Sequence, residues 1–273
     1  MRLRVLHRTA YAYDEPAQSV IQVLRLTPRN HEGQRIRNWR IDLDQDAQLK
    51  QGEDAFGNIF HVLSLPRALE DLVITVQGEV ETHSSDGVLN GSFEPFPPKL
   101  FLRETPLTQP NKELCEYAED VIAGKTPLEG LHALLAALHR DMEFDTEPTD
   151  VSTTAAQAFT ARHGVCQDLS HVFIAAARSQ GIPARYIGGY MFREDGQVHQ
   201  EAGHAWVEAY VRDLGWVGFD PANGFSPTDA HIRVAVGLDY LGASPVRGSR
   251  YGGTQEQLSV SVAVEQAGQR QQQ

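Results

Sequence analysis

The chain has 273 residues, enough for one large domain or two ordinary ones, and its hydrophobic content of 41% allows a buried core. A net charge of −12 argues against nucleic acid and against an acidic membrane surface as partners, because both require basic patches. No stretch approaches the ~18 consecutive apolar residues of a membrane span, and the charged first residues do not resemble a secretion signal, so we expect a cytoplasmic protein.

The first part of the chain has the alternation of β-strands. In "RLRVLHRTAYAY", Leu3, Val5, Tyr11 and Tyr13 fall on one parity, and "NWRIDLD", "NIFHVLSLP" and "DLVITVQGEVE" continue the pattern. Turn signals such as "DAFGN" separate these segments. The pattern predicts an N-terminal β-rich domain over residues 1–85, folded as an antiparallel β-sandwich.

Residues 86–110 are rich in Pro, Gly and Ser and are predicted to form an extended linker that packs across both parts of the molecule. Helices follow. Asn111 is a good N-cap for the segment "NKELCEYAEDVIAG". In "TPLEGLHALLAALHRDM", Thr126 and Glu129 have the spacing of a capping box, ahead of a leucine-rich face. A shorter helix is predicted over residues 154–161.

After one more predicted helix, the sequence pattern changes back to β-strands. A helix is predicted from Gln167 to about Gln180, followed by strands in "ARYIGGYMF", "HAWVEAYV" and "GWVGFDP". The order predicts an α+β fold, with a core over residues 111–224 in which helices pack on an antiparallel sheet. Residues 225–273 are predicted to be an extension that packs on this core, with one strand in "QLSVSVAV" and a disordered polar tail, "EQAGQRQQQ".

Three residues of this region have the chemistry of a nucleophilic site. Cys166 falls where the predicted helix starts, and the positive end of a helix stabilises a thiolate and a developing oxyanion. His204 opens one strand and Asp220 closes the next, so an antiparallel pair would place them side by side, joined by a side-chain hydrogen bond. Cys115 lies on an amphipathic helix without such neighbours and is expected to pack in the core.

The segments "GVCQDLSHVFIAAARSQGIPARYIGGY", "HAWVEAYV" and "GWVGFDPANG" resemble the core of the transglutaminase-like superfamily, bacterial branch. The resemblance covers residues 114–223. "HRTAYAYDEP", "LRLTPR" and "DAFGN" are similar to the β-rich N-terminal region of that branch, and "GLDYLGASPVRG" to a later segment. The resemblance implies a papain-like core with a catalytic triad of Cys166, His204 and Asp220.

The family resemblance implies acyl transfer at an amide. Cys166 would attack the carbonyl, His204 would protonate the departing amine, and Asp220 would hold the imidazole tautomer. The resulting thioester would pass to water or to a primary amine acceptor. The implied partner is therefore a peptide or protein amide substrate; the sequence identifies neither the substrate nor the oligomeric state.

Five further residues are candidates for the oxyanion hole or the lining of the site: Gln167, Asp168, His171, Trp206 and Tyr240. Each also has an ordinary structural explanation. Asp168 is a favourable acid in the first turn of a helix, and we slightly prefer this structural explanation for it. A packed histidine is an equal alternative for His171, Trp206 is more typical of a core than of a substrate platform, and Tyr240 is a loop aromatic that would roof the cleft.

Three alternatives stay open. The first is a cysteine peptidase or amidase without transferase activity, and the second is a non-catalytic peptide-binding module on the same fold. The third is a zinc protein, which would have to gather Cys166, His163, His171, His199 and His204. No C-x-x-C or H-x-x-x-H spacing and no EF-hand loop supports a metal site, so neither a metal nor a cofactor is predicted.

Overall fold

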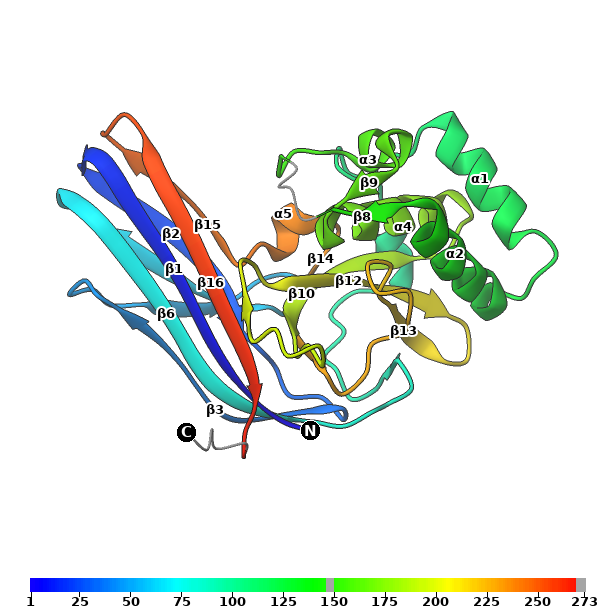
Figure 1. Ribbon diagram of the computed structural model, residues 1–273, viewed down its shortest axis with the longest axis horizontal. Coiled ribbons are helices and arrows are strands. Elements are labelled where there is room, and N and C mark those ends of the chain that lie inside the picture. Colours follow the sequence, from blue (N-terminus) through cyan, green and yellow to red (C-terminus); the bar gives the residue numbers. More distant parts are fainter. Residues whose placement is uncertain (146–149, 269–273) are drawn as a thin grey trace.

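The structure is a computed structural model in which residues 1–145 and 150–268 are described. Long strands gather on one side of the molecule, and helices with a shorter sheet gather on the other (Figure 1). These two parts correspond to the predicted β-sandwich and to the predicted α+β core. The core has the α+β arrangement expected from the sequence, with helices packed on an antiparallel sheet.

The β-sandwich consists of two antiparallel sheets, with strand orders β11-β16-β1-β6-β3 and β15-β2-β5-β4. Its strands are β1 (Arg2–Ala17), β2 (Ser19–Thr27), β3 (Gln34–Leu43), β4 (Lys50–Glu53), β5 (Ile59–Leu65), β6 (Leu69–Thr82), β11 (His199–Gln200), β15 (Val246–Tyr251) and β16 (Glu256–Gln266). Residues of β1 alternate between buried and exposed, as predicted, and Leu24, Leu63 and Leu72 fill the space between the sheets. The period of two in the sequence therefore identifies the buried face.

The C-terminal extension divides between the two parts, which corrects the prediction that it packs on the core. Only β14 (His231–Gly237) and the short helix α5 (Tyr240–Ala243) join the core. β15 pairs with β2, and β16 pairs with β1 from Leu3↔Gln266 to Tyr13↔Glu256. An alternating strand such as "QLSVSVAV" needs a partner, and β1 offers one along its whole edge. The predicted tail begins within β16, and its residues 269–273 lie outside the described part.

The core is built on a five-stranded sheet of order β14-β10-β12-β13-β7. Its other strands are β7 (Val88–Leu89), β10 (Ala184–Met191), β12 (His204–Val211) and β13 (Gly215–Phe219). The helical elements are η1 (Pro98–Leu102), α1 (Lys112–Ile122), α2 (Pro127–Asp141), α3 (Ala155–Ala161) and α4 (Cys166–Ser179), with β8 (Glu143–Phe144) and β9 (His163–Gly164) as a parallel pair. α4 is the central helix: it is buried from Asp168 to Arg178 and packs on β10 and β12.

The helix starts follow the predicted capping chemistry. The Asn111 side chain accepts from the backbone N–H of Leu114, and Thr126 and Glu129 form a reciprocal capping box. The helix predicted over residues 154–161 is present as α3, capped by Thr154. Each cap satisfies backbone donors that a helix leaves free at its first turn.

Residues 86–110, predicted as a linker, cover one face of the core sheet. β7 adds to the sheet beside β13, and the buried ring of Phe101 packs edge-on against Trp216, with ring centroids 5.1 Å apart. Glu94 forms an ion pair with the buried Arg185. This segment therefore contributes a strand, an aromatic side chain and a charge to the core.

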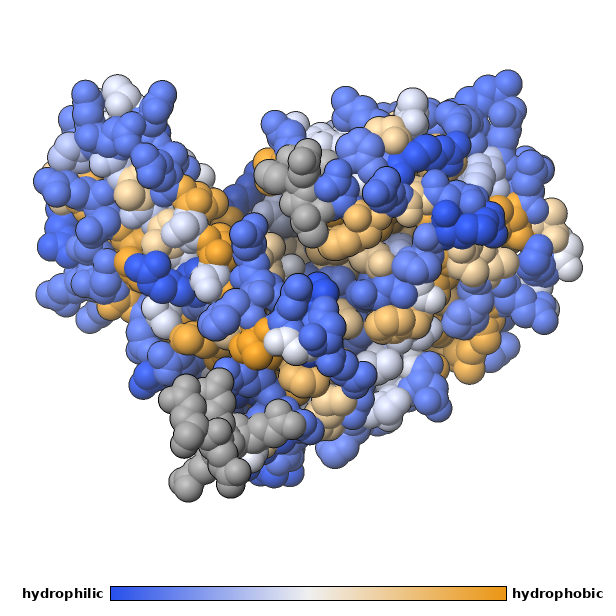
Figure 2. All heavy atoms as spheres, in the orientation of Figure 1, coloured by the Kyte–Doolittle hydropathy of each residue, from blue (hydrophilic) through white to orange (hydrophobic). Residues whose placement is uncertain are grey.

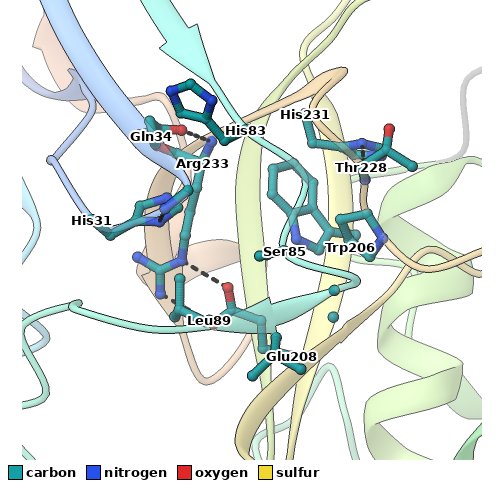
Figure 3. Close-up of a pocket in the computed structure, with 15 residues that line it drawn as sticks. His31, Gln34, His83, Ser85, Leu89, Trp206, Glu208, Thr228, His231 and Arg233 are labelled. Atoms are coloured by element: carbon teal, nitrogen blue, oxygen red, sulfur yellow. Dashed lines mark hydrogen bonds and ion pairs between the residues drawn. The ribbon is translucent and has the colours of Figure 1, made fainter. Parts of the chain in front are cut away.

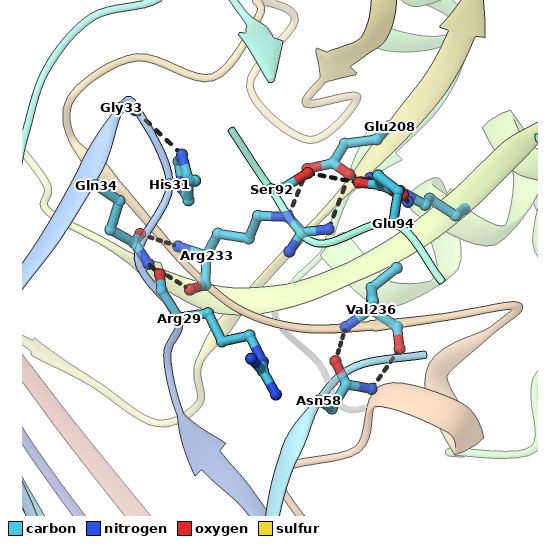
Figure 4. Close-up of polar contacts among 11 residues, drawn as sticks. Arg29, His31, Gly33, Gln34, Asn58, Ser92, Glu94, Glu208, Arg233 and Val236 are labelled. Carbon is cyan, nitrogen blue, oxygen red and sulfur yellow. Dashed lines mark hydrogen bonds and ion pairs between the residues drawn. The ribbon is translucent and has the colours of Figure 1, made fainter. Parts of the chain in front are cut away.

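Two amide side chains of the sandwich seal the outer edge of the core sheet. β14 is an edge strand, which leaves backbone groups unpaired. The Gln34 amide donates to the carbonyl of Arg233 (2.9 Å) and accepts from its N–H (2.8 Å). The Asn58 amide makes the same pair of bonds with Val236, at 2.7 and 2.8 Å (Figure 4). Both amides thus replace a neighbouring strand and join the two parts of the molecule.

The two parts separate at one end of the molecule. Figure 2 shows a notch between the free end of the sandwich and the helical side, and α5 borders this notch in the orientation of Figure 1. Leu241 of α5 exposes 39% of its surface. Within residues 1–145 and 150–268, no helix is long and apolar enough to cross a membrane.

Candidate active site

Cys166 is the first residue of α4, one residue earlier than the predicted start. Val165 precedes the helix in an extended conformation, and its backbone N–H donates to the carboxylate of Asp168 at 3.0 Å. The turn requires Gly164, because a Cβ there would lie 2.7 Å from the Cβ of Asp168. Cys166 is half-buried at the positive end of a helix, where the N–H groups of the first turn have no acceptor within the helix.

His204 and Asp220 meet as the strand order predicts. His204 begins β12, and Asp220 directly follows β13, its antiparallel neighbour, in which Val207 pairs with Phe219. The Nε2 atom of His204 and the Oδ2 atom of Asp220 are 2.6 Å apart, which confirms the predicted hydrogen bond. Asp220 has no exposed surface. The carboxylate is therefore shielded from solvent, and its interactions are with the protein groups around it.

The imidazole of His204 lies between a carboxylate and a thiol. Burial lowers the pKa of His204, but the charge of Asp220 and hydrogen bonds to Asp220 and Cys166 outweigh it and raise the pKa to about 10. Because Nε2 is used by Asp220, Nδ1 is the nitrogen left for Cys166. The ring is thus held as an imidazolium that can stabilise a thiolate on one side.

Asp220 receives more donors than the sequence predicts. The Asn223 side chain donates to Oδ2 at 2.7 Å, and its backbone N–H donates to Oδ1 at 3.2 Å. The Nε2 atom of His231 lies 3.2 Å from Oδ2. Asn223 follows Asp220 by three residues, a turn spacing that could have identified it. His231 comes from β14, and no sequence signal connects it with the site.

These contacts keep Asp220 ionised despite its burial. Burial raises the pKa of Asp220, but the charge of His204 and hydrogen bonds from His204 and His231 lower it well below its ordinary value. A buried carboxylate without such partners would be protonated near neutral pH. The cluster is therefore a charged acceptor that fixes the ring of His204.

Two of the five further candidates take structural positions. Asp168 caps the start of α4 through the N–H of Val165, as favoured from the sequence. His171 has no exposed surface, and its Nε2 atom accepts from the backbone N–H of Tyr240 at 3.0 Å. Burial lowers the pKa of His171 to about 4. It is therefore a neutral ring that ties α4 to α5 rather than a residue that exchanges protons with substrate.

The other three candidates differ in their contacts. The Gln167 side chain bonds to the carbonyl of Val151 at 3.4 Å, so it is turned toward that loop. The Trp206 ring is buried and stacks on His204, with centroids 6.1 Å apart and an interplanar angle of 27°. Tyr240 begins α5 and packs against the core rather than lying in a loop. Of these three, Trp206 is the one whose ring stacks on His204 among the described residues.

The structure does not gather the five residues of the zinc alternative. His171 is bound to Tyr240, and His199 lies on β11, which pairs with β16. Among the described residues, the group with metal-ligand character is instead His204, Asp220 and His231, whose ligand atoms lie within 4.8 Å of one another. Both imidazoles already bond to the same carboxylate oxygen. That arrangement fits a hydrogen-bonded cluster around Asp220.

Comparison with known proteins identifies both parts of the chain. Residues 116–221 match the model of the transglutaminase-like superfamily, and residues 3–81 match the bacterial transglutaminase-like N-terminal region. An uncharacterized protein of Mycobacterium tuberculosis is 30% identical over 304 residues, covering 96% of this chain and 92% of the relative. A protein-glutamine gamma-glutamyltransferase of Pseudomonas aeruginosa is 30% identical over 142 residues, which are 44% of this chain and 21% of that protein.

A solved structure has the same fold throughout. A protein of Cytophaga hutchinsonii, provisionally described as a cysteine protease, superposes with a TM-score of 0.76 at 18% sequence identity. The superposition covers 97% of this chain and 98% of the other. At this identity the likeness concerns the fold, including the placement of a β-rich part beside an α+β core.

Proposed function

The chain belongs to the transglutaminase-like superfamily, and from that premise we propose that it is an enzyme that transfers the acyl group of an amide through a cysteine thioester. The substrate is a peptide or protein amide, and the acceptor is water or a primary amine. Cys166 is the nucleophile, His204 the acid and base, and Asp220 the residue that orients His204. A cytoplasmic location stays a prediction.

The position of His204 is the observation that supports this proposal most strongly. One ring nitrogen bonds to a buried, ionised carboxylate, and the thiol of Cys166 acts on the same ring and raises its pKa. A nucleophile, a base and an orienting acid within hydrogen-bond reach are the geometry required for covalent catalysis. A packed structural histidine would not need an ionised carboxylate on one side and a helix-start thiol on the other.

The steps follow from these positions. The Cys166 thiolate attacks the amide carbonyl, and the oxyanion that forms is stabilised by backbone N–H groups at the start of α4, that of Cys166 first. His204 then gives its proton to the departing nitrogen, which leaves as ammonia or an amine, and a thioester remains on Cys166. In the second half, His204 takes a proton from water or from an amine as that molecule attacks the thioester. Cys166 is released as the thiolate.

The fate of the thioester distinguishes the leading proposal from its alternative. Attack by a primary amine gives an amide and makes the protein a transferase. Attack by water gives a carboxylic acid and makes it a cysteine peptidase or amidase. Exclusion of water from the acyl-enzyme decides between them. The pairing of Cys166 with His204 disfavours a non-catalytic peptide-binding module, which would not need an activated thiol.

The first test is alkylation of the native protein with iodoacetamide across pH, with mass spectrometry to locate the label. We expect Cys166 to react well below pH ~8.5, where an ordinary thiol ionises, because the imidazolium of His204 stabilises its thiolate. Cys115 is an internal control, since it is the other cysteine of the chain and is also half-buried. In a His204→Ala variant, labelling of Cys166 should shift to higher pH.

Turnover is the second test. Ammonia release from a glutamine-containing protein, measured with and without a fluorescent primary amine, reports both outcomes of the thioester. Label incorporated into the protein indicates transfer, and ammonia release without incorporation indicates hydrolysis. Cys166→Ala should abolish both. A folded Cys166→Ala variant with undiminished turnover, or a Cys166 that labels like Cys115, would contradict the mechanism.

A further inference from the structure

His231 lies against the proposed triad, although the mechanism above gives it no part. Its side chain is 2% exposed, and its Nε2 atom lies 3.2 Å from Asp220 Oδ2. Its Nδ1 atom accepts from the backbone N–H of Thr228 at 3.1 Å. Because Nδ1 is an acceptor, the proton of the neutral ring is on Nε2. His231 therefore donates to the oxygen of Asp220 that also binds His204.

The sheet is shaped to bring the two histidines together. His204 is on β12 and His231 on β14, with β10 between them. Gly189 of β10 pairs with His204. A Cβ at Gly189 would lie 2.7 Å from the ring of Trp206 and 2.1 Å from the carbonyl oxygen of Ile232. The glycine thus leaves the space that the Trp206 ring and the Ile232 carbonyl occupy, and His204 and His231 reach the same carboxylate oxygen.

The surroundings of His231 favour a neutral ring. Burial is the largest effect on the pKa of His231 and lowers it. Asp220 and His204 are the titratable groups that act on it, while Trp206 and Phe225 contribute uncharged ring contacts. As an uncharged donor, the His231 ring stabilises the Asp220 carboxylate without adding a second positive charge next to the imidazolium of His204.

The other side of His231 faces a cavity between the sandwich and the core. The cavity has a volume of about 60 Å³, with His231 and Trp206 on one wall and His31 and Arg233 on the opposite one (Figure 3). Arg233 is bound to Glu208 by two hydrogen bonds. The guanidinium group of Arg233 on the opposite wall is therefore compensated, and the contacts of the His231 ring nitrogens are those to Asp220 and Thr228.

We propose that His231 is a positioning residue, whose Nε2–H holds Asp220 Oδ2 against His204 so that the thiolate–imidazolium pair forms. This rests on the proposed function. Three donors, from His204, Asn223 and His231, meet at Oδ2. With His231 removed, the buried carboxylate is less well stabilised as an anion and freer to rotate. The imidazolium then gains less from Asp220, and the thiolate of Cys166 gains less from the imidazolium.

Two substitutions separate this role from packing. His231→Asn can keep an acceptor near the position of Nδ1, for the N–H of Thr228, and removes the donor to Asp220. His231→Gln can keep a donor near the position of Nε2 and removes the bond to Thr228. The matched control is His7→Asn, because His7 is a similarly buried histidine with two side-chain hydrogen bonds, to Tyr190 and Thr9, away from the triad.

The readout is the pH at which Cys166 of the full-length protein becomes reactive to iodoacetamide. In His231→Asn this onset should rise by about 0.5–1 pH unit, the equivalent of one ordinary hydrogen bond. In His231→Gln the rise should be at most half of that in His231→Asn. In His7→Asn the onset should equal that of the wild-type protein. Thermal unfolding and circular dichroism establish that each variant is folded. A folded His231→Asn protein with the wild-type onset would overturn the inference.

A measurement on the wild-type protein tests the same point without substitution. Nitrogen-15 NMR of the histidine rings should show His231 at pH 7 as the neutral tautomer protonated on Nε2. A ring protonated on Nδ1 would overturn the inference. The proposed function fails separately: if wild-type Cys166 itself labels like an ordinary thiol, the triad proposal is wrong. If wild-type Cys166 is activated and His231→Asn changes nothing, only the role of His231 is wrong.

Discussion

Two buried polar clusters share one face of the core sheet and differ in what they can do. At one end His204 of β12 and His231 of β14 meet at Asp220. Further along the same strands, Glu208 of β12 bonds to Arg233 of β14. Trp206 lies between them, stacked on His204 and edge-on to His231. Because residues two apart on a strand share a face, the same two strands build both clusters.

The difference between the clusters is the kind of group that each contains. Burial raises the pKa of Glu208, but the charges and hydrogen bonds of Arg233 and Arg185 lower it to about 2. With Glu94 added, two carboxylates balance two guanidinium groups (Figure 4). Carboxylates and guanidinium groups ordinarily titrate far from neutral pH. The Asp220 cluster contains imidazoles, the groups that exchange protons in this range. One cluster fixes the sheet, and the other can move a proton.

The largest effect should come from breaking the cluster that can move a proton. Asp220→Asn retains the shape of the side chain but offers His204 an uncharged amide, so the ring can take the wrong tautomer. We expect turnover to fall by roughly 10³–10⁴-fold, as when the acid of other triads is replaced. Steady-state kinetics measure the effect. Turnover within tenfold of wild type would remove Asp220 from the mechanism.

Breaking the compensated cluster should act on stability instead. Glu208→Gln leaves Arg185 and Arg233 buried without their shared counter-charge, and we expect a loss of about 3–5 kcal/mol in the free energy of unfolding. Chemical denaturation measures it. The pH onset of Cys166 labelling should stay unchanged. Glu79→Gln is the control, because Glu79 pairs with Arg2 and Arg4 at the surface and should cost much less. Equal losses in both variants would refute the contrast.

The amide side chains of Gln34 and Asn58, which bond to the edge strand β14, allow a third comparison of stability. Gln34→Ala or Asn58→Ala leaves a backbone N–H and a carbonyl of β14 unpaired in a buried position. We expect each to reduce the free energy of unfolding by about 1–3 kcal/mol. Gln51→Ala, at an exposed position on β4, should change it little. If the seal variants denature like the control, water replaces the amides and the two parts are joined by other contacts.

The smallest effect is a pH dependence that only the Asp220 cluster should produce. The pKa of His204 is raised to about 10 in the folded protein, so its contribution to stability is complete below the ordinary value of 6.5 and is lost as pH rises toward 10. We expect a fall of about 1–2 kcal/mol between pH 7 and pH 9. Asp220→Asn should flatten it, whereas Glu208→Gln should not. A wild-type protein with pH-independent stability in this range would show that His204 is not held as an imidazolium.

Local chemistry made much of the molecule predictable. The alternation of Leu3 and Val5 gave the face of β1, and Asn111 and Thr126 marked helix starts through the caps they form. The order of β12 and β13 placed His204 beside Asp220, because an antiparallel pair brings the start of one strand to the end of the next. In each case the cause lies within one element or between neighbours in the chain.

The pairing of β16 with β1 and the approach of His231 to Asp220 were decided only by the tertiary structure. β16 and β1 are separated by most of the chain, and β14 is separated from β13, which Asp220 follows, by two strands of the core sheet. An alternating pattern states that a strand needs a partner but does not name the partner, and a histidine at the start of a strand does not reveal which carboxylate it faces. The sequence by itself determined the elements and the residues that can do the chemistry. The packing of distant strands determined which polar groups surround them, because a buried donor is satisfied by whatever the fold brings within 3 Å or so of it.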